Sequence, residues 1–473
     1  MSVEIEISII RGIPRHTVVG LPNAAVRESL DRIRAAILAE GLDFPRGAIT
    51  INLAPADVRK EGTSFDLPIA LGILVASGTI LGIENFEKTL IMGELALDGS
   101  VRPVRGILAA LNGAMNRGCT TFIVPEGNVA EAMVLDGIRA FGVASLGEAI
   151  RALSGRSEPQ KESPLLNGRQ EAQYTMDFGD VVGQKGAIRA MEVAATGGHN
   201  LLLIGPPGCG KTMLSRRLPS ILPDWTSQEA LDATCIHSLR GLGQSGLLGS
   251  RPFRAPHHSV SMAGMIGGGN PVLPGEVSLA HEGVLFLDEL AEFSRSVLES
   301  LREPLEEGSV IISRAQGPVR YPARFQLIGA MNPCPCGFSG VVGASCTCHP
   351  RQRMQYRGKV SGPLMDRIDM QVFMVPVDPT RERKDARMHS VDIKERVQKA
   401  RELLGASPIS TSTGALQGDT AVLLNRAVGR LGLSMRAMER IKKVSKTIAA
   451  LDGATLASPL HLSEALRYRR VWH

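Results

Sequence analysis

The chain contains 473 residues, of which 44% are hydrophobic, 4% are aromatic and 21% are charged. A chain of this length exceeds what one hydrophobic core usually organises, so we expect two or three domains. The least polar stretch, residues 67–83, is interrupted by proline, glycine and serine, which argues against a membrane span of about 20 apolar residues. The first ten residues alternate acidic and apolar side chains, which is typical of a strand and not of a signal peptide. We therefore expect a cytoplasmic protein without a membrane partner.

The formal net charge of +6 is unevenly distributed along the chain. Residues 1–151 carry 14 lysines and arginines against 17 acidic residues, whereas the remaining residues carry 39 against 30. A basic excess in the second part is what nucleic-acid binding requires. An exposed basic face without a partner explains the same numbers, so the charge alone does not decide between these interpretations.

Residues 1–154 alternate strand-like and helix-like segments and lack a phosphate-binding loop. The stretch 23–40 places apolar residues at helical spacing, which predicts an amphipathic helix. Predicted strands cover residues 17–21, 48–53, 89–92 and 121–124. This pattern predicts an α+β or α/β domain. Residues 155–175 are polar, contain proline and show no apolar period, so we interpret them as a linker.

The strongest motif lies in residues 199–212, where a short apolar run leads into a glycine-rich loop. The loop follows the pattern G-x-x-x-x-G-K-[ST], with a buried strand predicted before it and a helix after it. Its glycines let successive backbone N–H groups point at an anion, while Lys211 can reach the β- and γ-phosphates and Thr212 can bind Mg²⁺. The predicted ATP-binding residues of the loop are Gly205, Pro206, Pro207, Gly208, Cys209, Gly210, Lys211 and Thr212.

Two later strands end in polar residues that complete such a site. Residues 283–287 predict a buried strand that ends at Asp288 and Glu289. In ATP hydrolysis the first carboxylate holds Mg²⁺, usually through water, and the second polarises the attacking water. The next strand, 325–330, leads to Asn332, which we expect to help orient that water. The same asparagine also suits a turn before the following proline, and the two roles are compatible.

Beyond about residue 380 the chain loses strand character. Helices of a small lid are predicted at residues 391–404, 420–431, 434–451 and 463–471. Ser434 and Ser463 are expected to cap the third and fourth of these helices, and Gly453 to end the third. The pattern therefore predicts an α/β ATPase core at 176–380 and a helical lid at 381–473.

Four of the seven cysteines lie in one short segment, 334–349. They are Cys334, Cys336, Cys346 and Cys348. In a reducing compartment such a cluster indicates a metal site more readily than disulfides. The C-x-C spacing is tighter than the usual C-x₂-C, so a structural zinc site requires the two pairs to fold toward each other, and reduced thiols without a metal are the alternative. His257 and His258 are adjacent and lack a spaced partner, so we expect a structural or pore-loop role for them.

Several longer motifs follow one another in a fixed order. They are HNLLLIGPPGCGKT at 199–212, FRAPHHSVSMAGMIGGG at 253–269, PGEVSLAHEGVLFLDEL at 274–290, NPCPCG at 332–337, SGPLMDRID at 361–369 and LSMRAMERI at 433–441. Through them the chain resembles the ComM/YifB family of magnesium-chelatase-like AAA+ ATPases over nearly its whole length. The resemblance implies a P-loop core with a helical lid, ATP and Mg²⁺ as cofactors, and a homo-hexameric ring that drives DNA branch migration. Family members usually begin with a further strand or two, so we expect this chain to open partway into its first domain.

Residues 60–71 and 93–108 resemble the proteolytic domain of Lon-type peptidases. This resemblance implies a Lon-like α+β fold for residues 1–154 and places Ser64 at the position of the nucleophile. The lysine that should activate this serine falls on Leu108, and a serine without a neighbouring base is a poor nucleophile. We therefore expect a Lon-like scaffold without peptidase chemistry, although the nearby Lys60 leaves that activity open.

The resemblance to AAA+ ATPases implies three further roles. The residues expected to border the adenine are Val182, Gly183 and Gln184. Arg367 corresponds to an arginine finger that reaches the γ-phosphate of the neighbouring subunit, with an intrachain salt bridge to Asp366 or Asp369 as the alternative. Arg436, in the lid, corresponds to an arginine that touches the γ-phosphate.

Two insertions are expected to contact DNA, branched or single-stranded, in the pore of the ring. Residues 308–324 read as a hairpin that carries Arg314, Arg320 and Arg324, and residues 262–274 form a glycine-rich insertion. Arginines there would bind phosphates and carry little sequence information. A hairpin that only packs between subunits is the alternative. Two other functions stay open, namely a magnesium-chelatase-type motor subunit and a Lon-like ATP-dependent peptidase.

Overall fold

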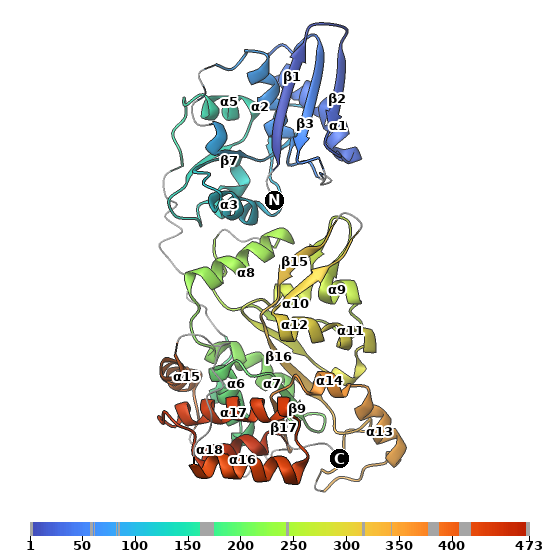
Figure 1. The fold of residues 1–473 in the computed structure, drawn as a ribbon, viewed down its shortest axis with the longest axis vertical. Helices are drawn as coiled ribbons and strands as arrows, with labels where there is room; N and C mark the ends of the chain where they lie inside the picture. Colours follow the sequence, from blue (N-terminus) through green and yellow to red (C-terminus); the bar gives the residue numbers. More distant parts are fainter. Residues whose placement is uncertain are drawn as a thin grey trace. The chain divides into compact units, whose positions relative to one another are not determined.

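The computed structural model describes residues 3–56, 60, 62–81, 83, 86–160, 175–242, 246–314, 317–341, 343–376, 387–405 and 418–469. The chain divides into two units (Figure 1). Unit 1 comprises Met1–Glu171, Leu231–Gly249 and Ser313–Pro318, and unit 2 comprises Ala172–Ala230, Ser250–Ile312 and Val319–His473. Most of the predicted linker, residues 161–174, lies outside the described residues, and so does the predicted boundary between core and lid, residues 377–386. No helix among the described residues is both long and apolar enough to cross a membrane.

The first part of unit 1 is a three-stranded sheet covered by two helices. Its elements are β1 (Glu4–Ile10), β2 (Arg15–Val19), α1 (Ala24–Ala39), β3 (Ala48–Ala54) and α2 (Asp66–Ala76). Strand β3 lies in the middle, antiparallel to β1 and parallel to β2. Exposed and half-buried residues alternate along β1, so the predicted amino-terminal strand is confirmed, with one face on the core. Asn23 caps α1 by accepting a hydrogen bond from the N–H of Val26 at 3.0 Å.

A buried ion pair fixes the two helices of this part. Nε and Nη2 of Arg32, on α1, donate to the two carboxylate oxygens of Asp66, on α2, at 3.0 and 3.1 Å. Burial raises the pKa of Asp66 to about 6, although the guanidinium of Arg32 opposes this shift. The pair therefore holds α1 and α2 in one arrangement, because a buried carboxylate without its partner is strongly unfavourable.

The second part of unit 1 is built on a parallel sheet in the order β4–β7–β8. Its elements are β4 (Thr89–Ile91), β5 (Glu94–Leu95), β6 (Val101–Arg102), α3 (Ile107–Met115), β7 (Thr121–Pro125), α4 (Val129–Ala132), β8 (Arg139–Val143) and α5 (Leu146–Leu153). Helix α8 (Ser227–Leu239) begins in unit 2, but its residues from Leu231 onward belong to unit 1. Leu231 and Cys235 pack against the buried cluster of α3, β7 and α4, and Ser238 donates a hydrogen bond to Glu131 at 2.7 Å.

Unit 2 is built on a five-stranded parallel sheet in the order β10–β13–β16–β9–β17. The strands are β9 (Leu201–Ile204), β10 (Phe253–Arg254), β13 (Val284–Leu287), β16 (Gln326–Met331) and β17 (Met370–Phe373). β9, β13 and β16 are buried along their whole length, as expected for a parallel sheet with both faces covered. The α/β P-loop fold predicted for this part is confirmed, and its strands at 201–204 and 284–287 lie where the apolar runs predict them.

Helices cover both faces of this sheet (Figure 1). They are α6 (Lys185–Gly197), α7 (Lys211–Arg217), α9 (Met262–Ile266), α10 (Glu276–Leu279), α11 (Arg295–Ser300), α12 (Arg302–Glu307), α13 (Pro350–Gly358) and α14 (Gly362–Met365), together with the lid helices α15 to α18. Leu201 and Leu203 of β9 point to the face covered by α6, α7 and the lid. Leu202 and Ile204 point to the opposite face, which α9 to α14 cover, so successive residues anchor opposite layers.

Two short hairpins extend from the second face. They are formed by β11 (Gly267–Gly268) with β12 (Leu273–Pro274), and by β14 (Ser309–Ile312) with β15 (Val319–Pro322). The hydroxyl of Tyr321, on β15, donates to the carbonyl of Val272 at 2.8 Å, which ties the two hairpins together. The hairpin predicted within 308–324 is therefore confirmed.

The described residues of the lid, 387–405 and 418–469, form four helices, as predicted. They are α15 (Ser390–Leu404), α16 (Gly418–Leu431), α17 (Met435–Leu451) and α18 (Pro459–Arg467). Ser434 caps α17 and accepts from the N–H of Ala437, as expected. The predicted cap Ser463 is wrong, because it lies inside α18 and donates to the carbonyl of Pro459. Ser458 caps α18 instead, in a capping box with His461. The helix begins directly after this serine because a proline is favourable at the first helical position.

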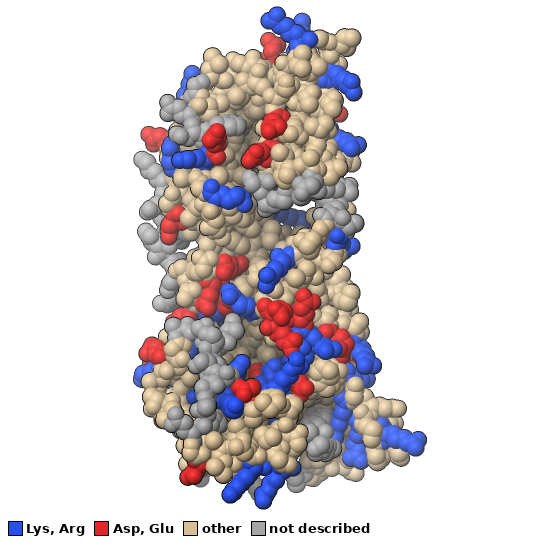
Figure 2. All heavy atoms as spheres, viewed as in Figure 1, with Lys and Arg blue, Asp and Glu red and all other residues tan. Residues whose placement is uncertain are grey.

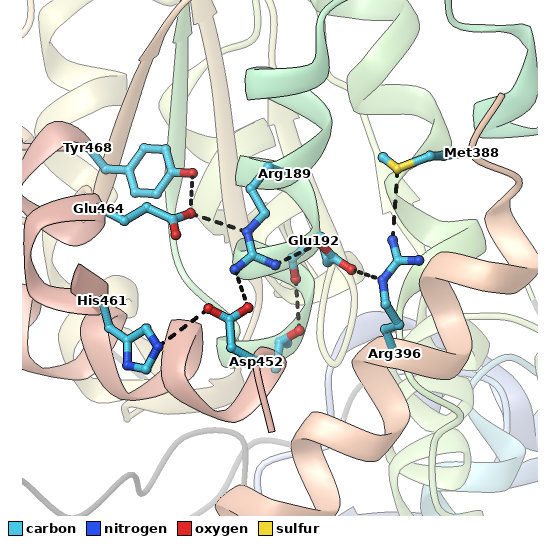
Figure 3. Close-up of polar contacts among 9 residues, drawn as sticks. Arg189, Glu192, Met388, Arg396, Asp452, His461, Glu464 and Tyr468 are labelled. Carbon is cyan, nitrogen blue, oxygen red and sulfur yellow. Dashed lines mark hydrogen bonds and ion pairs between the residues drawn. The ribbon is translucent and has the colours of Figure 1, made fainter. Parts of the chain in front are cut away.

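A network of charged side chains attaches the lid to α6 (Figure 3). Arg189, on α6, pairs with Glu192 at 3.2 Å, with Asp452 at 2.9 Å and with Glu464 at 3.2 Å. The second carboxylate oxygen of Glu192 accepts from Nε of Arg396, on α15, at 2.5 Å. Burial opposes the charge of Arg189, but the surrounding carboxylates outweigh it and raise its pKa.

Glu192 is the central residue of this network, because it serves two guanidinium groups and its side chain is only 5% exposed. We predict that Glu192→Ala lowers the free energy of unfolding of unit 2 by about 2 kcal/mol, since two half-buried cations lose their shared partner. Calorimetric and urea unfolding of the full chain measure the change.

Glu395→Ala is the matched control, because this glutamate is exposed on α15 and its loss should change the unfolding free energy by less than about 0.5 kcal/mol. Equal stability of the two variants would contradict a structural role for the network.

Candidate functional site

The glycine-rich loop joins the carboxyl end of β9 to α7, as the sequence predicts. The loop begins at Gly205, whose N–H donates to the carbonyl of Met331 at 3.2 Å. Gly208 and Gly210 have φ values of +76° and +92°, which side chains with a Cβ rarely adopt. The loop therefore has the curled backbone that a phosphate-binding loop needs.

Lys211 lies folded over this loop. Its ammonium group donates to the carbonyls of Gly205 and Pro206 at 2.7 and 2.9 Å, and to Oδ1 of Asn332 at 3.1 Å. Burial lowers the pKa of Lys211. Asn332 directly follows β16, so the structure brings the predicted asparagine next to the predicted lysine.

Thr212 and Asp288 meet on the other side of the loop. The hydroxyl of Thr212 donates to Oδ2 of Asp288 at 2.7 Å, and Asp288 follows the end of β13. A hydroxyl and a carboxylate in contact are the oxygen ligands that Mg²⁺ takes in P-loop ATPases. The donor set therefore fits a magnesium ion bound together with phosphates.

Glu289 extends beyond this pair toward open space. Its φ is +51° and its side chain is 60% exposed. Oε2 of Glu289 lies 3.6 Å from Nδ1 of His258. The His258 ring packs against the His257 ring, with centroids 4.1 Å apart and planes tilted by 34°, and forms an edge contact with Phe293. Sequence reasoning missed this neighbour of the glutamate, because no local pattern links two residues that only the sheet brings together.

Gln184 ties the predicted adenine-binding segment to the phosphate loop. The glutamine has φ +56° and precedes α6. Its Nε2 donates to the carbonyl of Cys209 at 3.1 Å and to that of Val375 at 2.7 Å. Val182 exposes its side chain, and Gly183 adopts a φ of +69°. The segment thus borders the phosphate loop, and its contact with a base stays a prediction.

The four clustered cysteines converge on one point. Sγ of Cys334 lies 3.3 Å from that of Cys336 and 3.7 Å from that of Cys346, and the Cys336–Cys346 distance is 3.6 Å. All four sulfur atoms lie within 4.8 Å of one another. A tetrahedral zinc ion with Zn–S bonds of about 2.3 Å separates its sulfur ligands by about 3.8 Å. The donor set therefore fits a tetrahedral thiolate metal site.

Arg367 is held within its own chain. Its side chain is 6% exposed and pairs with Glu306 at 2.5 Å, while Nε and Nη1 donate to the carbonyls of Arg302 and Pro363. The alternative predicted an intrachain salt bridge, which exists, but its predicted partner is wrong. Arg367 pairs with Glu306, whereas Asp366 pairs with Arg469 and Asp369 pairs with Arg440.

Arg436 lies close to the same glutamate but is exposed. Its Nη2 is 3.8 Å from Oε1 of Glu306, and its side chain is 66% exposed. It lines a cavity of about 530 Å³ together with the residues that precede β9, β13, β16 and β17. Because the strands are parallel, this cavity is at the amino edge of the sheet and the phosphate loop is at the carboxyl edge. A four-residue strand separates the edges by about 13 Å.

The three predicted DNA-binding arginines have different surroundings. Arg314 is exposed in the hairpin tip that belongs to unit 1. Arg320, on β15, is exposed and donates to the hydroxyl of Ser309 at 3.0 Å. Arg324 follows the hairpin and pairs with the buried Glu282 at 2.7 Å, so it is a structural residue of the amino edge.

In unit 1, Ser64 has no activating base among the described residues. Leu108 is completely buried in the cluster around α3. The ammonium of Lys60 donates a hydrogen bond to the carbonyl of Pro55. The described residues therefore do not form a Ser–Lys pair, and the Lon-like assignment of residues 1–154 stays a prediction.

Comparison with known families covers most of the chain. Residues 177–382 match the family described as "Magnesium chelatase, subunit ChlI". Residues 4–128 match "Subunit ChlI of Mg-chelatase" and residues 387–469 match "Magnesium chelatase, subunit ChlI C-terminal".

Individual relatives align over nearly the full length. The competence protein ComM of Haemophilus influenzae is 41% identical, covering 99% of this chain and 94% of that protein. The uncharacterized protein YifB of Escherichia coli is 40% identical with the same coverage. The magnesium-chelatase 67 kDa subunit of Chlorobaculum parvum is 25% identical over 49% of this chain and 32% of its own length.

The contact between His258 and Glu289 generates a prediction. His258→Ala should lower kcat for ATP hydrolysis about tenfold, because the glutamate loses the neighbour that orients it. The dissociation constant for nucleotide should change little, since His258 does not touch the phosphate loop. Single-turnover hydrolysis and nucleotide titration separate the two quantities.

His258→Asn, which keeps a hydrogen-bond donor, should recover most of the rate. Glu289→Gln is the reference variant, expected to bind ATP without hydrolysing it. An unchanged kcat in His258→Ala would remove the positioning role.

Proposed function

Since the chain belongs to the ComM/YifB family of magnesium-chelatase-like AAA+ ATPases, we propose that it is an ATP-driven motor that remodels DNA. The observation that carries the proposal is the meeting of Lys211, Thr212, Asp288, Glu289 and Asn332 at one edge of the sheet. A competence protein among the relatives supports DNA as the partner. Branch migration of recombining DNA is the specific activity that we infer.

The residues of the site divide the work of hydrolysis. Lys211 and the backbone N–H groups of the loop bind the phosphates, and Thr212 and Asp288 hold Mg²⁺, which neutralises phosphate charge. Glu289 accepts a proton from the attacking water and polarises it. Asn332, next to Lys211 at the tip of β16, orients that water.

The arginines require a second subunit. Arg367 and Arg436 lie around Glu306 at the amino edge of the sheet, whereas their own phosphate loop is at the carboxyl edge. We propose that subunits stack in a ring, hexameric as the family resemblance implies, so that these cations face the ATP of the next subunit. Arg367 must leave Glu306 to act there, whereas Arg436 is already exposed.

DNA contacts are proposed at the tip and the outer strand of the β14–β15 hairpin, through Arg314 and Arg320. All three arginines are exposed, but Arg324 is already paired with Glu282. Figure 2 shows further basic side chains projecting where Figure 1 places α13. Such residues bind phosphates without reading sequence, as a motor that moves along DNA requires.

A magnesium-chelatase-type motor is the second candidate function, favoured by the three matching family descriptions. This function predicts that the rate of ATP hydrolysis depends on a large partner protein and does not change when DNA is added. A Lon-like peptidase is disfavoured, because Ser64 has no base in the described part of unit 1.

We predict that four-way junction DNA stimulates ATP hydrolysis by the full chain. The double variant Arg314→Ala, Arg320→Ala should lose this stimulation and keep the basal rate, because neither residue touches the nucleotide site. Losing two phosphate contacts should also reduce the slope of log affinity against log salt by about two. Steady-state hydrolysis and DNA titrations at several salt concentrations measure both effects.

Arg11→Ala, Arg117→Ala is the charge-matched control, since both residues are exposed and belong to neither the tip nor the strands of the β14–β15 hairpin. Absence of stimulation by junction, forked and single-stranded DNA would reject the DNA motor.

A mixing experiment addresses cooperation between subunits. Lys211→Ala and Arg367→Ala should each lower hydrolysis by about 100-fold or more when tested alone. Mixed assemblies should regain activity, because an intact phosphate loop of one variant can meet an intact arginine of the other. Arg436→Ala gives a second variant, at the exposed lid arginine.

Lys211→Ala mixed with Glu289→Gln is the control, because both changes disable the same half of the site and cannot complement. A monomer that hydrolyses ATP at full rate, or an unimpaired Arg367→Ala variant, would overturn the arrangement.

A further inference from the structure

The cysteine loop, defined as residues 334–348, begins two residues after the nucleotide-site residue Asn332. Cys334 lies two residues after Asn332, the residue that accepts from Lys211, and is itself completely buried. Apart from residue 342, the described residues 332–349 contain no helix or strand. A segment without helix or strand has few backbone hydrogen bonds that hold its conformation. Its conformation therefore depends on crosslinks between its side chains.

One turn of the cysteine loop packs against the phosphate loop. The N–H of Gly337 donates to the carbonyl of Cys334 at 2.9 Å, and Gly337 has a φ of +87°. A Cβ at Gly337 would lie 2.5 Å from Cδ and 3.0 Å from Cγ of Pro207. The bare backbone of Gly337 is therefore in close contact with the proline ring of the phosphate loop, and a shift of this turn would move Pro207.

The second pair of cysteines connects the cysteine loop to α13. His349 follows Cys348 and caps α13 in a capping box with Gln352. Tyr356, buried on this helix, lies beside the backbone of Asn332. One end of the cysteine loop is joined to Asn332 through the chain. The other end leads into α13, whose Tyr356 lies beside Asn332.

The sulfur atoms join these two ends. N–H groups of Ser339 and Cys336 donate to the sulfurs of Cys334 and Cys348 at 3.3 Å, an arrangement that stabilises thiolates. All four cysteines are free, and the sulfurs of Cys334, Cys336 and Cys346 lie 3.3 to 3.7 Å apart, well beyond the S–S bond length of about 2.05 Å. A disulfide does not hold the cysteine loop together in this arrangement.

We propose that a soft divalent cation, of which zinc is the type, is bound by these four thiolates and forms part of the nucleotide site. By closing the cysteine loop, the ion fixes Gly337 against Pro207 and Asn332 against Lys211, and so sets the affinity of the phosphate loop for ATP. The inference rests on the proposed ATP binding at this loop. Binding of the ion releases the remaining thiol protons to solvent and involves no redox step.

The test compares metal content with nucleotide affinity in the full chain. Metal analysis of the purified protein should give about one zinc per chain. Removal of zinc by a thiol-compatible chelator that spares Mg²⁺ should weaken binding of a fluorescent ADP analogue about tenfold or more. Adding zinc back should restore the original affinity, measured in fluorescence titrations without any turnover.

Cys348→Ser should lose both the zinc and the response to added zinc. Cys119→Ser is the matched control, since this cysteine lies in unit 1, and should behave like the parent. Gly337→Ala is the second variant. It keeps all four thiols and should retain zinc while binding the analogue weakly, because its Cβ displaces Pro207.

The outcomes separate the inference from the proposed function. Zinc-loaded parent protein that fails to bind the nucleotide analogue overturns the ATPase proposal. Protein that binds the analogue equally well with and without zinc overturns the inference and leaves the ATPase proposal standing. Absence of zinc together with four freely reactive thiols in the purified protein also overturns the inference.

Discussion

The parallel packing of β13, β16 and β9 is the constraint on which the nucleotide site depends. Neighbouring parallel strands bring their carboxyl ends to one edge, and these strands are buried along their whole length. The hydrogen bonds Thr212–Asp288 and Lys211–Asn332 consequently join residues that are 76 and 121 positions apart in sequence. The attraction between these polar groups is too weak to offset the chain entropy lost in bringing them together. Hydrophobic burial of the strands therefore positions them.

The same parallel packing gathers a second set of charged residues at the amino edge of the sheet, away from the phosphate loop. Glu282 precedes β13, Arg324 precedes β16 and Asp369 precedes β17, so these residues gather at the amino edge with Glu306. There the ion pairs are intrachain and partly buried, and burial lowers the pKa of the neighbouring His281 to about 4. Arg367 and Arg436 lie about a full strand length from their own phosphate loop. The proposed ring rests on this separation, because a second copy would bring such arginines to a nucleotide.

Helix α6 carries groups for both the nucleotide and the lid. Gln184 at its amino end bonds to the phosphate loop, whereas Arg189 and Glu192 in its middle bind the lid helices. A movement of the lid that shifts α6 would reach the loop through Gln184. The polar network fixes this geometry more specifically than apolar packing, because each guanidinium matches carboxylates in a limited set of directions.

The sequence by itself determined the elements and residues whose signals are local. The phosphate loop, the strands that lead to Asp288 and Asn332, and the cap at Ser434 all follow from patterns within a few residues, and the structure agrees with them. Only the tertiary structure decided which charges pair: Arg367 with Glu306 and not with its neighbouring aspartates, and Arg324 with Glu282. It alone placed His258 beside Glu289, and the residues from Leu231 onward in unit 1. The reason is that side-chain partners are set by which strands and helices share an edge, and this depends on the packing of the whole unit.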